Sequence, residues 1–360
     1  MQKAIENRFI HTFSSKDGYK FGFRYGEKTD AKDLIEIFED VYDYDYLYPY
    51  VYDIDEFKKR IRDRSQIWFI VEHLANGKVV ATGMVKRLNE ISIYAAKVLS
   101  KKEYQGKGIM SVLGTRSVLY TLSRPKLRNI LRLATEVRAY SKGSQKFADK
   151  LNCICYGFIP NYNNYADKRE FDIGQGESYN KGRIEPVLMY FSPIKTFWRL
   201  RERNIILYDH ENISKFYKTM RKNTRRLKHD NVNYQSGKTL SCNDFSIKED
   251  PYKSHILIRG CLKVKTLEHL LEKYDNWNVI EWRVPTTMKG INSQKIALQK
   301  EFKVMGYDPG SNYKITHTED AILFCTFPNG IDVAQFQGMD IYEKNQPIVD
   351  LVLEAISGTN

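Results

Sequence analysis

The stretch Lys97-Val-Leu-Ser-Lys-Lys-Glu-Tyr-Gln-Gly-Lys-Gly-Ile-Met110 decides the fold. An apolar segment, residues 91–99, is predicted to be a strand that leads into Gln105-Gly106-Lys107-Gly108, and a helix is predicted to start directly afterwards. Glycine lets the backbone approach a ligand closely, and the unpaired N–H groups at the start of a helix attract anions. Lys107 adds a positive charge. The stretch therefore predicts a loop that holds a diphosphate.

The segments on both sides of this loop alternate between strand and helix patterns. Before it, helices are predicted to start after Asp30 and Asp53, and strands are predicted at 21–25, 67–72, 79–85 and 91–99. Asn76-Gly77 is typical of a tight hairpin between two of these strands. After the loop, the pattern predicts helix 108–123, strand 130–138, helix 144–151 and strand 187–191. This order predicts an α/β protein with a mixed sheet.

The loop resembles the acetyl-CoA-binding motif of the GNAT superfamily of N-acetyltransferases, Gln/Arg-x-x-Gly-x-Gly/Ala. Gln105 and Gly108 match this motif, and Met110 stands where a small residue is usual. The order of the predicted elements also resembles that fold over residues 18–192. The resemblance implies a GNAT N-acyltransferase domain at residues 1–193, with acetyl-CoA or another acyl-CoA as the donor and no metal.

By the same resemblance, the end of strand 91–99 is expected to splay from its neighbour. Its backbone groups would bind the pantetheine arm and the thioester oxygen, where an N–H stabilises the oxyanion. A second family pattern, Asn-x-x-Ala-x-x-Leu-Tyr, reads Gln145-Lys-Phe-Ala148-Asp-Lys-Leu151-Asn152 here. Asn152 thus replaces the tyrosine that often protonates the leaving thiolate. The implied cofactor-binding residues are Val98, Leu99, Ser100, Gln105, Gly106, Lys107, Gly108, Ile109, Met110 and Gln145.

Three residues are candidates for proton transfer. Glu136, in strand 130–138, is expected next to the acceptor site, where a carboxylate can take a proton from an amine directly or through a water. The alternative is a structural role, in which Glu136 pairs with Arg138 or a neighbouring strand. Glu90 is the second candidate for the base. Tyr156 is a candidate for the vacant acid, with Tyr140 or solvent as the alternatives, although a packed aromatic is the favoured explanation of Tyr156.

A tyrosine-rich segment lies between the first two predicted helices. It reads Asp40-Val-Tyr-Asp-Tyr-Asp-Tyr-Leu-Tyr-Pro-Tyr-Val-Tyr-Asp53. The GNAT fold usually builds its acceptor wall there, and alternating tyrosine and aspartate suits a cationic amine through charge and cation–π contacts. The alternative is that the tyrosines pack a surface loop or an inter-domain contact.

The second half of the sequence repeats a pattern of the first. Ser144-Gln145-Lys146 and Gly157-Phe158-Ile159-Pro160 recur as Ser293-Gln294-Lys295 and Gly306-Tyr307-Asp308-Pro309, with a constant offset of 149 residues. The alternative is chance similarity of two α/β units. Because the corresponding loop, 260–265, lacks Gly-x-Gly, we interpret residues 194–360 as a degenerate GNAT-like domain without a cofactor loop. We expect it to shape the acceptor site or to form a homodimer.

Composition limits the class of protein. The chain has 360 residues, five cysteines without regular spacing and a net charge of +13, and it has no apolar run of membrane length or signal-peptide pattern. We therefore expect a cytoplasmic protein with no membrane partner. The charge suits a phosphate-rich cofactor, nucleic acid or an acidic carrier protein. A basic cluster at 215–228 is explained either by such a partner or by the solvated face of an amphipathic helix.

The resemblance implies an N-acyltransferase whose partner is an amine-bearing small molecule or a peptide side chain. The amine would attack the thioester of acyl-CoA directly. The alternative is a catalytically silent binding module that has kept the fold and holds RNA or an acidic protein. Met110 and Asn152 favour this alternative, whereas the intact segment Gln105–Gly108 opposes it.

Overall fold

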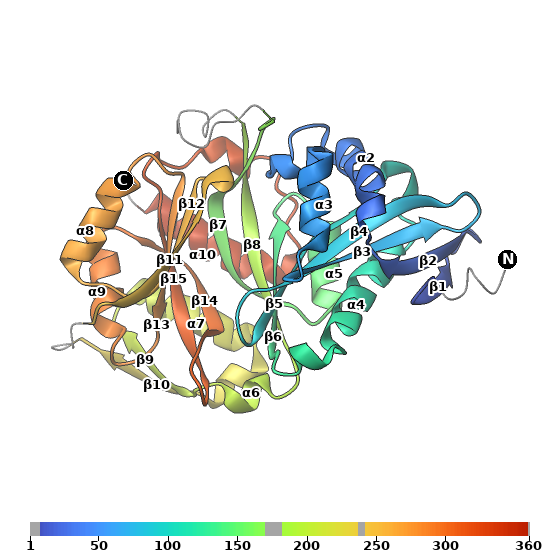
Figure 1. The fold of residues 1–360 in the computed structure, drawn as a ribbon. Coiled ribbons are helices and arrows are strands. Elements are labelled where there is room, and N and C mark those ends of the chain that lie inside the picture. Colours follow the sequence, from blue (N-terminus) through green and yellow to red (C-terminus); the bar gives the residue numbers. More distant parts are fainter. Residues whose placement is uncertain (1–7, 170–181, 237–241, 359–360) are drawn as a thin grey trace. The chain divides into compact units, whose positions relative to one another are not determined.

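The computed structural model describes residues 8–169, 182–236 and 242–358 (Figure 1). The described residues form two compact units, residues 8–135 with 166–169, and residues 136–165 with 182–236 and 242–358. The division falls inside the strand Arg132–Arg138, and the domain boundary predicted after residue 193 stays a prediction.

The first unit contains a mixed sheet, as the sequence predicts. Its strand order is β1 (His11–Ser14), β2 (Lys20–Tyr25), β3 (Gln66–His73), β4 (Lys78–Arg87), β5 (Ser92–Ser100) and β6 (Arg132–Arg138). Neighbours from β1 to β5 pair antiparallel, whereas β5 and β6 pair parallel. Gly77, in the predicted hairpin between β3 and β4, has a left-handed φ of 69°, which glycine adopts without strain.

Helices cover both faces of this sheet (Figure 1). On one face, α2 (Ala31–Tyr42) and α3 (Ile54–Arg62) form an apolar core with alternate residues of the strands, among them Trp68 and Ile70. On the other face, Phe23 lies between Phe69 and Tyr120 of α4 (Ile109–Leu122). The remaining helical turns of this unit are η1 (Lys28–Asp30), η2 (Pro49–Tyr52), η3 (Lys102–Tyr104) and η4 (Pro125–Leu127).

The second unit also contains a mixed sheet. Its strand order is β8 (Arg183–Pro193), β7 (Ile154–Tyr165), β14 (Lys303–Tyr313), β15 (Thr318–Thr326), β13 (Val279–Pro285), β12 (His255–Cys261) and β11 (Asp244–Asp250). A separate parallel pair consists of β9 (Asn204–Tyr208) and β10 (Asn231–Gln235). The helices are α5 (Lys142–Lys150), α6 (Phe197–Leu200), α7 (Glu211–Asn223), α8 (Val264–Lys273), α9 (Ile291–Gln299) and α10 (Gln346–Ser357). The turns are η5 (Arg225–His229), η6 (Pro251–Lys253), η7 (Val333–Phe336) and η8 (Glu343–Asn345).

Two strand pairs of the second unit share the same irregularities. The β7–β8 register shifts between residues 155 and 157 and between 159 and 163. The β14–β15 register shifts between 304 and 306 and between 308 and 312, which is the same pattern displaced by 149 residues. Left-handed residues follow the same offset, Asn152 with Glu301 and Asn161 with Gly310.

The two equivalent strands meet at equivalent glycines. Gly157 of β7 is paired with Gly306 of β14 in an antiparallel arrangement. A Cβ on Gly306 would lie 2.3 Å from the Tyr156 carbonyl oxygen and 2.7 Å from the Gly157 Cα, which no real side chain tolerates. Only glycine at this crossing therefore allows β7 and β14 to approach, and this pairing places residues 154–165 in the second unit.

The basic cluster at 215–228 lies on α7 and η5. Its interleaved apolar residues Ile213, Phe216, Met220 and Leu227 are buried, whereas most of the cationic side chains are exposed. The amphipathic helix expected from the spacing is therefore present. Within the described residues, no helix has the length and apolar character needed to cross a bilayer.

Candidate functional site

The predicted diphosphate loop connects β5 to α4. Gly106 and Gly108 have left-handed φ angles of 78° and 79°, and Gly108 is the N-cap of α4. Left-handed backbone costs other residues about 1–2 kcal/mol, so both positions favour glycine. A Cβ built on either glycine meets no heavy atom within 4 Å. The loop therefore leaves open space where a Cβ would stand, directly at the positive end of a helix of 14 residues.

The charged residue of the loop is already in contact with the β1–β2 turn. The Lys107 ammonium lies 3.2 Å from a carboxylate oxygen of Asp17 and 4.5 Å from the centre of the Tyr19 ring. The Asp17 side chain is 57% exposed, and exposed ion pairs contribute little stability, so a phosphate can compete for this ammonium. Open space, unpaired helix N–H groups and a cation together fit an anionic group such as the pyrophosphate of CoA.

The strand that leads into the loop pairs in parallel with β6 within the first unit. The paired residues run from Ser92–Arg132 to Tyr94–Ala134, and the Thr135 hydroxyl donates a hydrogen bond to the Ala95 carbonyl at 3.0 Å. Val98, Leu99 and Ser100 lie further along β5, beyond these pairs. Their expected separation from the neighbouring strand stays a prediction.

A β-bulge interrupts β5 near its C-terminal end. Thr82 pairs with Leu99 and Met84 with Ala96, so Gly83 of β4 faces two residues, Lys97 and Val98. Lys97 has a left-handed φ of 56°, which is uncommon for a residue with a side chain. Bulges of this kind re-aim side chains next to functional sites.

The tyrosine-rich segment lies between α2 and α3, as the sequence predicts, and ends in η2. The rings of Tyr46, Tyr48 and Tyr50 all contact the ammonium of Lys97, with distances from Nζ to the ring centres of 5.5, 4.7 and 5.7 Å. Within this unit, three rings of the segment therefore surround one cationic side chain of the bulged strand.

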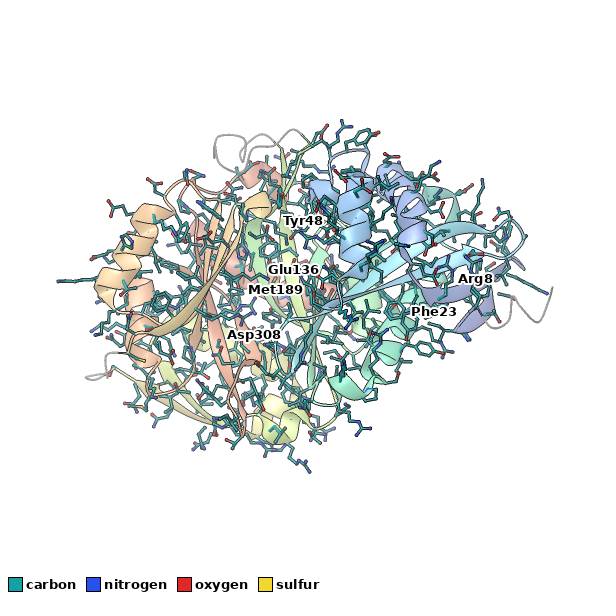
Figure 2. The ribbon with its side chains drawn as sticks, in the orientation of Figure 1. Arg8, Phe23, Tyr48, Glu136, Met189 and Asp308 are labelled. Carbon is teal, nitrogen blue, oxygen red and sulfur yellow. The ribbon has the colours of Figure 1, made fainter. Side chains whose placement is uncertain are left out.

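Glu136, which is labelled in Figure 2, has two partners in the second unit. Its carboxylate accepts a hydrogen bond from the Tyr162 hydroxyl at 2.7 Å and pairs with the Lys253 ammonium at 2.9 Å. Burial opposes ionisation of the carboxyl group, but the Lys253 charge and the two hydrogen bonds outweigh it and lower the pKa of Glu136 to about 2. A carboxylate this acidic is a weak proton acceptor near neutral pH.

The equivalent glutamate of the repeat has the same kind of environment. Glu281 is fully buried and contacts His255 at 2.9 Å and Arg283 at 2.5 Å. Burial opposes ionisation, but the Arg283 charge and the hydrogen bonds from these two residues outweigh it and lower the pKa of Glu281 to about 2. Arg283 in turn pairs with Asp308 at 2.8 Å. The contacts of Glu136 and Glu281 are of a structural kind. However, Glu136 does not pair with the predicted Arg138, which pairs with Glu185 at 2.7 Å instead. A role of Glu136 as the base stays a prediction.

Gln145 is buried, and both ends of its amide are bonded within the second unit. Its Nε2 donates to the carbonyl oxygens of Ala139 and Asp340 at 3.3 and 3.0 Å, and its Oε1 accepts from Tyr342 N at 2.8 Å. Gln294, its equivalent, likewise donates to the Pro285 carbonyl and accepts from Tyr208 N. These bonds anchor chain segments, and they weigh against the predicted contact with a cofactor arm.

The remaining candidates are placed as follows. Glu90 is exposed just before β5, at the strand end opposite to Val98–Ser100. Tyr156 is 2% exposed and packs against Phe191, with ring centres 6.1 Å apart, which is the packed-aromatic alternative. Asn152 is left-handed after α5, a conformation that asparagine tolerates better than most residues.

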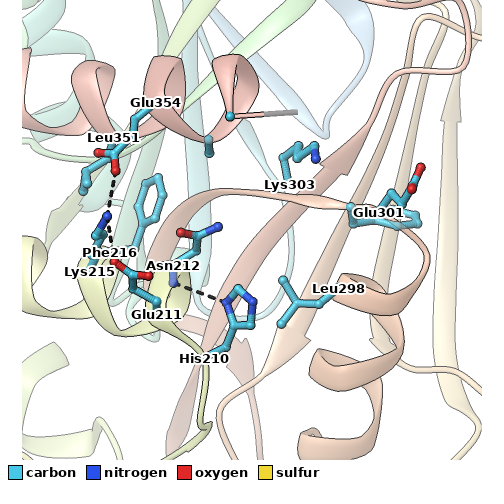
Figure 3. A pocket seen from close by; sticks show the side chains of 13 residues that line it. His210, Glu211, Asn212, Lys215, Phe216, Leu298, Glu301, Lys303, Leu351 and Glu354 are labelled. Carbon is cyan, nitrogen blue, oxygen red and sulfur yellow. Dashed lines mark hydrogen bonds and ion pairs between the residues drawn. The ribbon is translucent and has the colours of Figure 1, made fainter. Parts of the chain in front are cut away.

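The described part of the second unit contains a cleft of about 370 Å³ between α7, the α9–β14 turn and α10 (Figure 3). Lys215 crosses it and pairs with Glu211 at 3.0 Å and Glu354 at 2.7 Å. His210 accepts a hydrogen bond from Asn212 N and so caps α7. The cleft thus contains paired charges and a helix cap. No cluster of metal-binding side chains occurs among the described residues.

No protein-family model matches the chain, and no curated protein has significant sequence similarity to it. Solved structures are similar to about half of it. They include a chimeric spermidine N-acetyltransferase from Vibrio cholerae and hSSAT, with 16% identity, 48% of this chain and 95% of that chain covered, and a TM-score of 0.38. The ribosomal-protein-S5-alanine acetyltransferase of Vibrio fischeri is 16% identical, with 51% and 96% covered and a TM-score of 0.38. A GNAT-family acetyltransferase of Streptococcus pneumoniae is 14% identical, with 48% and 99% covered and a TM-score of 0.38.

The solved structures that are similar to about half of the chain are acetyltransferases, and one of them is described as a member of the GNAT family. TM-scores below 0.5 at such low identity give no information on activity, donor or acceptor.

Two features of the site were missed by sequence reasoning. The bulge at Lys97 has only Gly83, in the facing strand, as a signal, because a glycine inside a strand often marks a bulge or a close approach. The partners of Glu136 were also missed. Lys253 is 117 residues away in sequence and gives no local signal.

Proposed function

We propose that this chain is an acyl-CoA-dependent N-acyltransferase, which transfers an acetyl or other acyl group to a primary amine. The observation that supports the proposal most is the loop Gln105–Gly108. Two left-handed glycines with open space at their Cβ positions stand at the start of α4, after a bulged strand. The loop would provide the anion site, and the end of the bulged strand would provide backbone groups beside it.

The donor would be held by backbone more than by side chains. N–H groups from Gly106 to Met110 and the Lys107 ammonium would bind the diphosphate, and the end of β5 (Val98, Leu99, Ser100) would bind the arm. Met110 does not obstruct this arrangement, because the contacts are made by main-chain N–H groups. When bound, the donor supplies the acyl group and a thiolate leaving group. A backbone N–H at the end of β5 would stabilise the developing oxyanion.

The amine must lose a proton during transfer. We propose that Glu136 has a structural role, because its charge is committed to Lys253 and Tyr162 and its pKa is lowered to about 2. The proton would then leave to water. With Asn152 in place of the usual tyrosine and Tyr156 buried, solvent is also the simplest source of the proton for the thiolate.

We further propose that residues 194–360 are a degenerate copy of the second part of the first domain. The support is the shared offset of 149 residues in two register shifts and two left-handed positions. The parallel pair β12–β13, followed by antiparallel β15 and β14, resembles the element order after the loop in the first half. Gly260, in β12, is the lone glycine of residues 260–265, and its Cβ position is 2.2 Å from the Asp244 carbonyl oxygen, so it does not offer the open space found at Gly106 and Gly108. A role of this half in shaping the acceptor site or in dimerisation also remains a proposal.

A second candidate function is a silent binding module for RNA or an acidic protein. The exposed basic residues of α7 and η5 favour it, together with the internal hydrogen bonds of Gln145. Both candidates predict a folded protein, and they differ in whether acyl-CoA is bound and consumed.

Two measurements on the full chain test the proposal. Acetyl-CoA at ~100 times its dissociation constant should stabilise the fold by about 2.7 kcal/mol, seen as a rise in Tm. A mass-spectrometric screen of primary amines with several acyl-CoAs should then show an acylated product. Binding without any product would favour the silent module, and absence of binding would contradict the proposed function.

A further inference from the structure

Three tyrosine rings surround one ammonium group in the first unit. The centres of the rings of Tyr46, Tyr48 and Tyr50 lie 4.7–5.7 Å from Lys97 Nζ, inside the range of cation–π attraction. Tyr46 is 7% exposed and packs into the apolar core, and the other two rings are partly buried against it. We call these three residues the tyrosine cage (Tyr48 is labelled in Figure 2).

The cage contains Lys97 only because of the bulge in β5. Side chains alternate between the two faces of a strand, and Ala96 already faces the core formed with α2 and α3. Val98 faces α4, because a Cβ built on Gly83 would lie 3.6 Å from Val98 Cγ2 and 3.5 Å from Cγ of Leu113 in α4. Without the bulge, Lys97 would face α4 in the same way. The left-handed conformation of Lys97 turns its side chain to the cage instead.

Other tyrosine–cation contacts also occur in the tyrosine-rich segment, residues 40–53. The Arg169 guanidinium lies 3.6 Å from the centre of the Tyr44 ring, and that of Arg60 lies 4.9 Å from the centre of the Tyr50 ring. Asp43, Asp45 and Asp53, all exposed, add negative charge along the same segment. The chemistry of the surface is therefore selective for alkylammonium and guanidinium groups over neutral or anionic ones.

We propose that the tyrosine cage is the binding site for the alkylammonium end of the acceptor, and that Lys97 is a displaceable internal occupant of this site. The proposal rests on the proposed function for the identity of the ligand, since Lys97 directly precedes the residues assigned to the acyl donor. The Lys97 side chain is half-buried, and rotation about the bonds of its flexible four-carbon chain can move the ammonium out of the cage when an external ammonium enters. Only molecules whose cage is vacant can bind the acceptor. The apparent affinity is therefore the intrinsic affinity multiplied by the fraction of molecules whose cage is vacant.

The test is direct binding of n-butylammonium, with n-pentanol as the neutral control, to the full chain without acyl-CoA. Lys97→Met removes the internal ammonium and keeps the length of the side chain. If Lys97 fills the cage roughly nine-tenths of the time, this variant should bind n-butylammonium about tenfold more tightly than wild type. Adding Tyr48→Leu to Lys97→Met should abolish the gain, whereas adding Tyr48→Phe, which keeps the ring, should preserve it. Circular dichroism and Tm establish that each variant is folded.

The outcomes separate this proposal from the proposed function. Equal affinity of wild type and folded Lys97→Met for n-butylammonium would overturn the cage proposal, as would a gain that survives Tyr48→Leu. Tighter binding that n-pentanol reproduces would overturn it too, because the site would then be merely apolar. A cation-specific gain in a protein that does not bind acetyl-CoA would leave the cage standing and contradict the acyltransferase.

Discussion

Replacing Glu136 by glutamine tests whether this residue is structural or catalytic. The substitution keeps the shape of the side chain but leaves the Lys253 ammonium, whose side chain is 6% exposed, without its counter-charge. Lowering the pKa of the carboxyl group from 4.5 to about 2 corresponds to on the order of 3 kcal/mol of folding free energy, at 1.36 kcal/mol per tenfold change in proton affinity. Breaking a buried pair at one partner costs about 3–5 kcal/mol in other proteins, which agrees.

The direction of the pKa shift determines how the contribution of Glu136 to stability depends on pH. Because the folded pKa of Glu136 is depressed, its contribution is fully present above pH 4.5, the ordinary value, and is lost as the pH falls toward 2. Denaturant unfolding should therefore show Glu136→Gln less stable than wild type by about 3 kcal/mol at pH 7, with a smaller difference at pH 3. Adding Lys253→Met should recover part of the loss, since no unpaired buried charge remains. The exposed Glu90→Gln is the matched control and should change stability by less than about 0.5 kcal/mol.

Kinetics on the same variant distinguish the two roles. If Glu136 is structural, the pH profile of the remaining activity keeps its wild-type form. If Glu136 is the general base, kcat falls by about a hundredfold or more and rises again at high pH, where the amine arrives deprotonated. A Glu136→Gln variant as stable as wild type at pH 7 would refute the structural role.

Two further substitutions test the second unit. Gly306→Ala should destabilise the fold by about 1–3 kcal/mol or more, because its Cβ would meet the Tyr156 carbonyl oxygen at 2.3 Å. The control Gly143→Ala, in open space on α5, should be neutral or slightly stabilising. Equal melting temperatures of the two variants would refute the close approach. Gln145→Ala should lower the free energy of unfolding by about 2 kcal/mol or more and speed hydrogen exchange at Tyr342 N, while the affinity for CoA stays unchanged. The exposed Gln299→Ala is the control. A selective loss of CoA affinity in Gln145→Ala would instead support the predicted contact with the cofactor arm.

Local rules account for the parts of the molecule that the sequence predicted. The loop at Gly106 and Gly108 follows from a glycine pattern between a strand and a helix, and the start of α3 follows from Asp53, which accepts hydrogen bonds from Asp55 N and Glu56 N. The boundaries of β3 and β4 lie close to the predicted ones, because apolar β-branched runs are unambiguous there.

Long-range contacts account for the parts that it did not predict. Strand β7 contains glycine, proline and five asparagines or tyrosines in succession, which locally favour a turn, and it is a strand because β8 and β14 flank it. The hydrogen bond between Gln145 and the Asp340 carbonyl spans 195 residues. Likewise, nothing in the run Lys97-Val98-Leu99 signals a left-handed lysine, since the bulge depends on the facing strand.

The most direct test of the central claim is acetyl-CoA binding to Gly108→Glu, measured by calorimetry beside Gly77→Glu. Both glycines are left-handed with no heavy atom within 4 Å of a Cβ, so the two substitutions bring the same charge and the same backbone strain. Only Gly108 lies in the proposed diphosphate site. We predict that wild type and Gly77→Glu bind acetyl-CoA and that Gly108→Glu, still folded, does not. Equal affinity of the two variants would contradict the account.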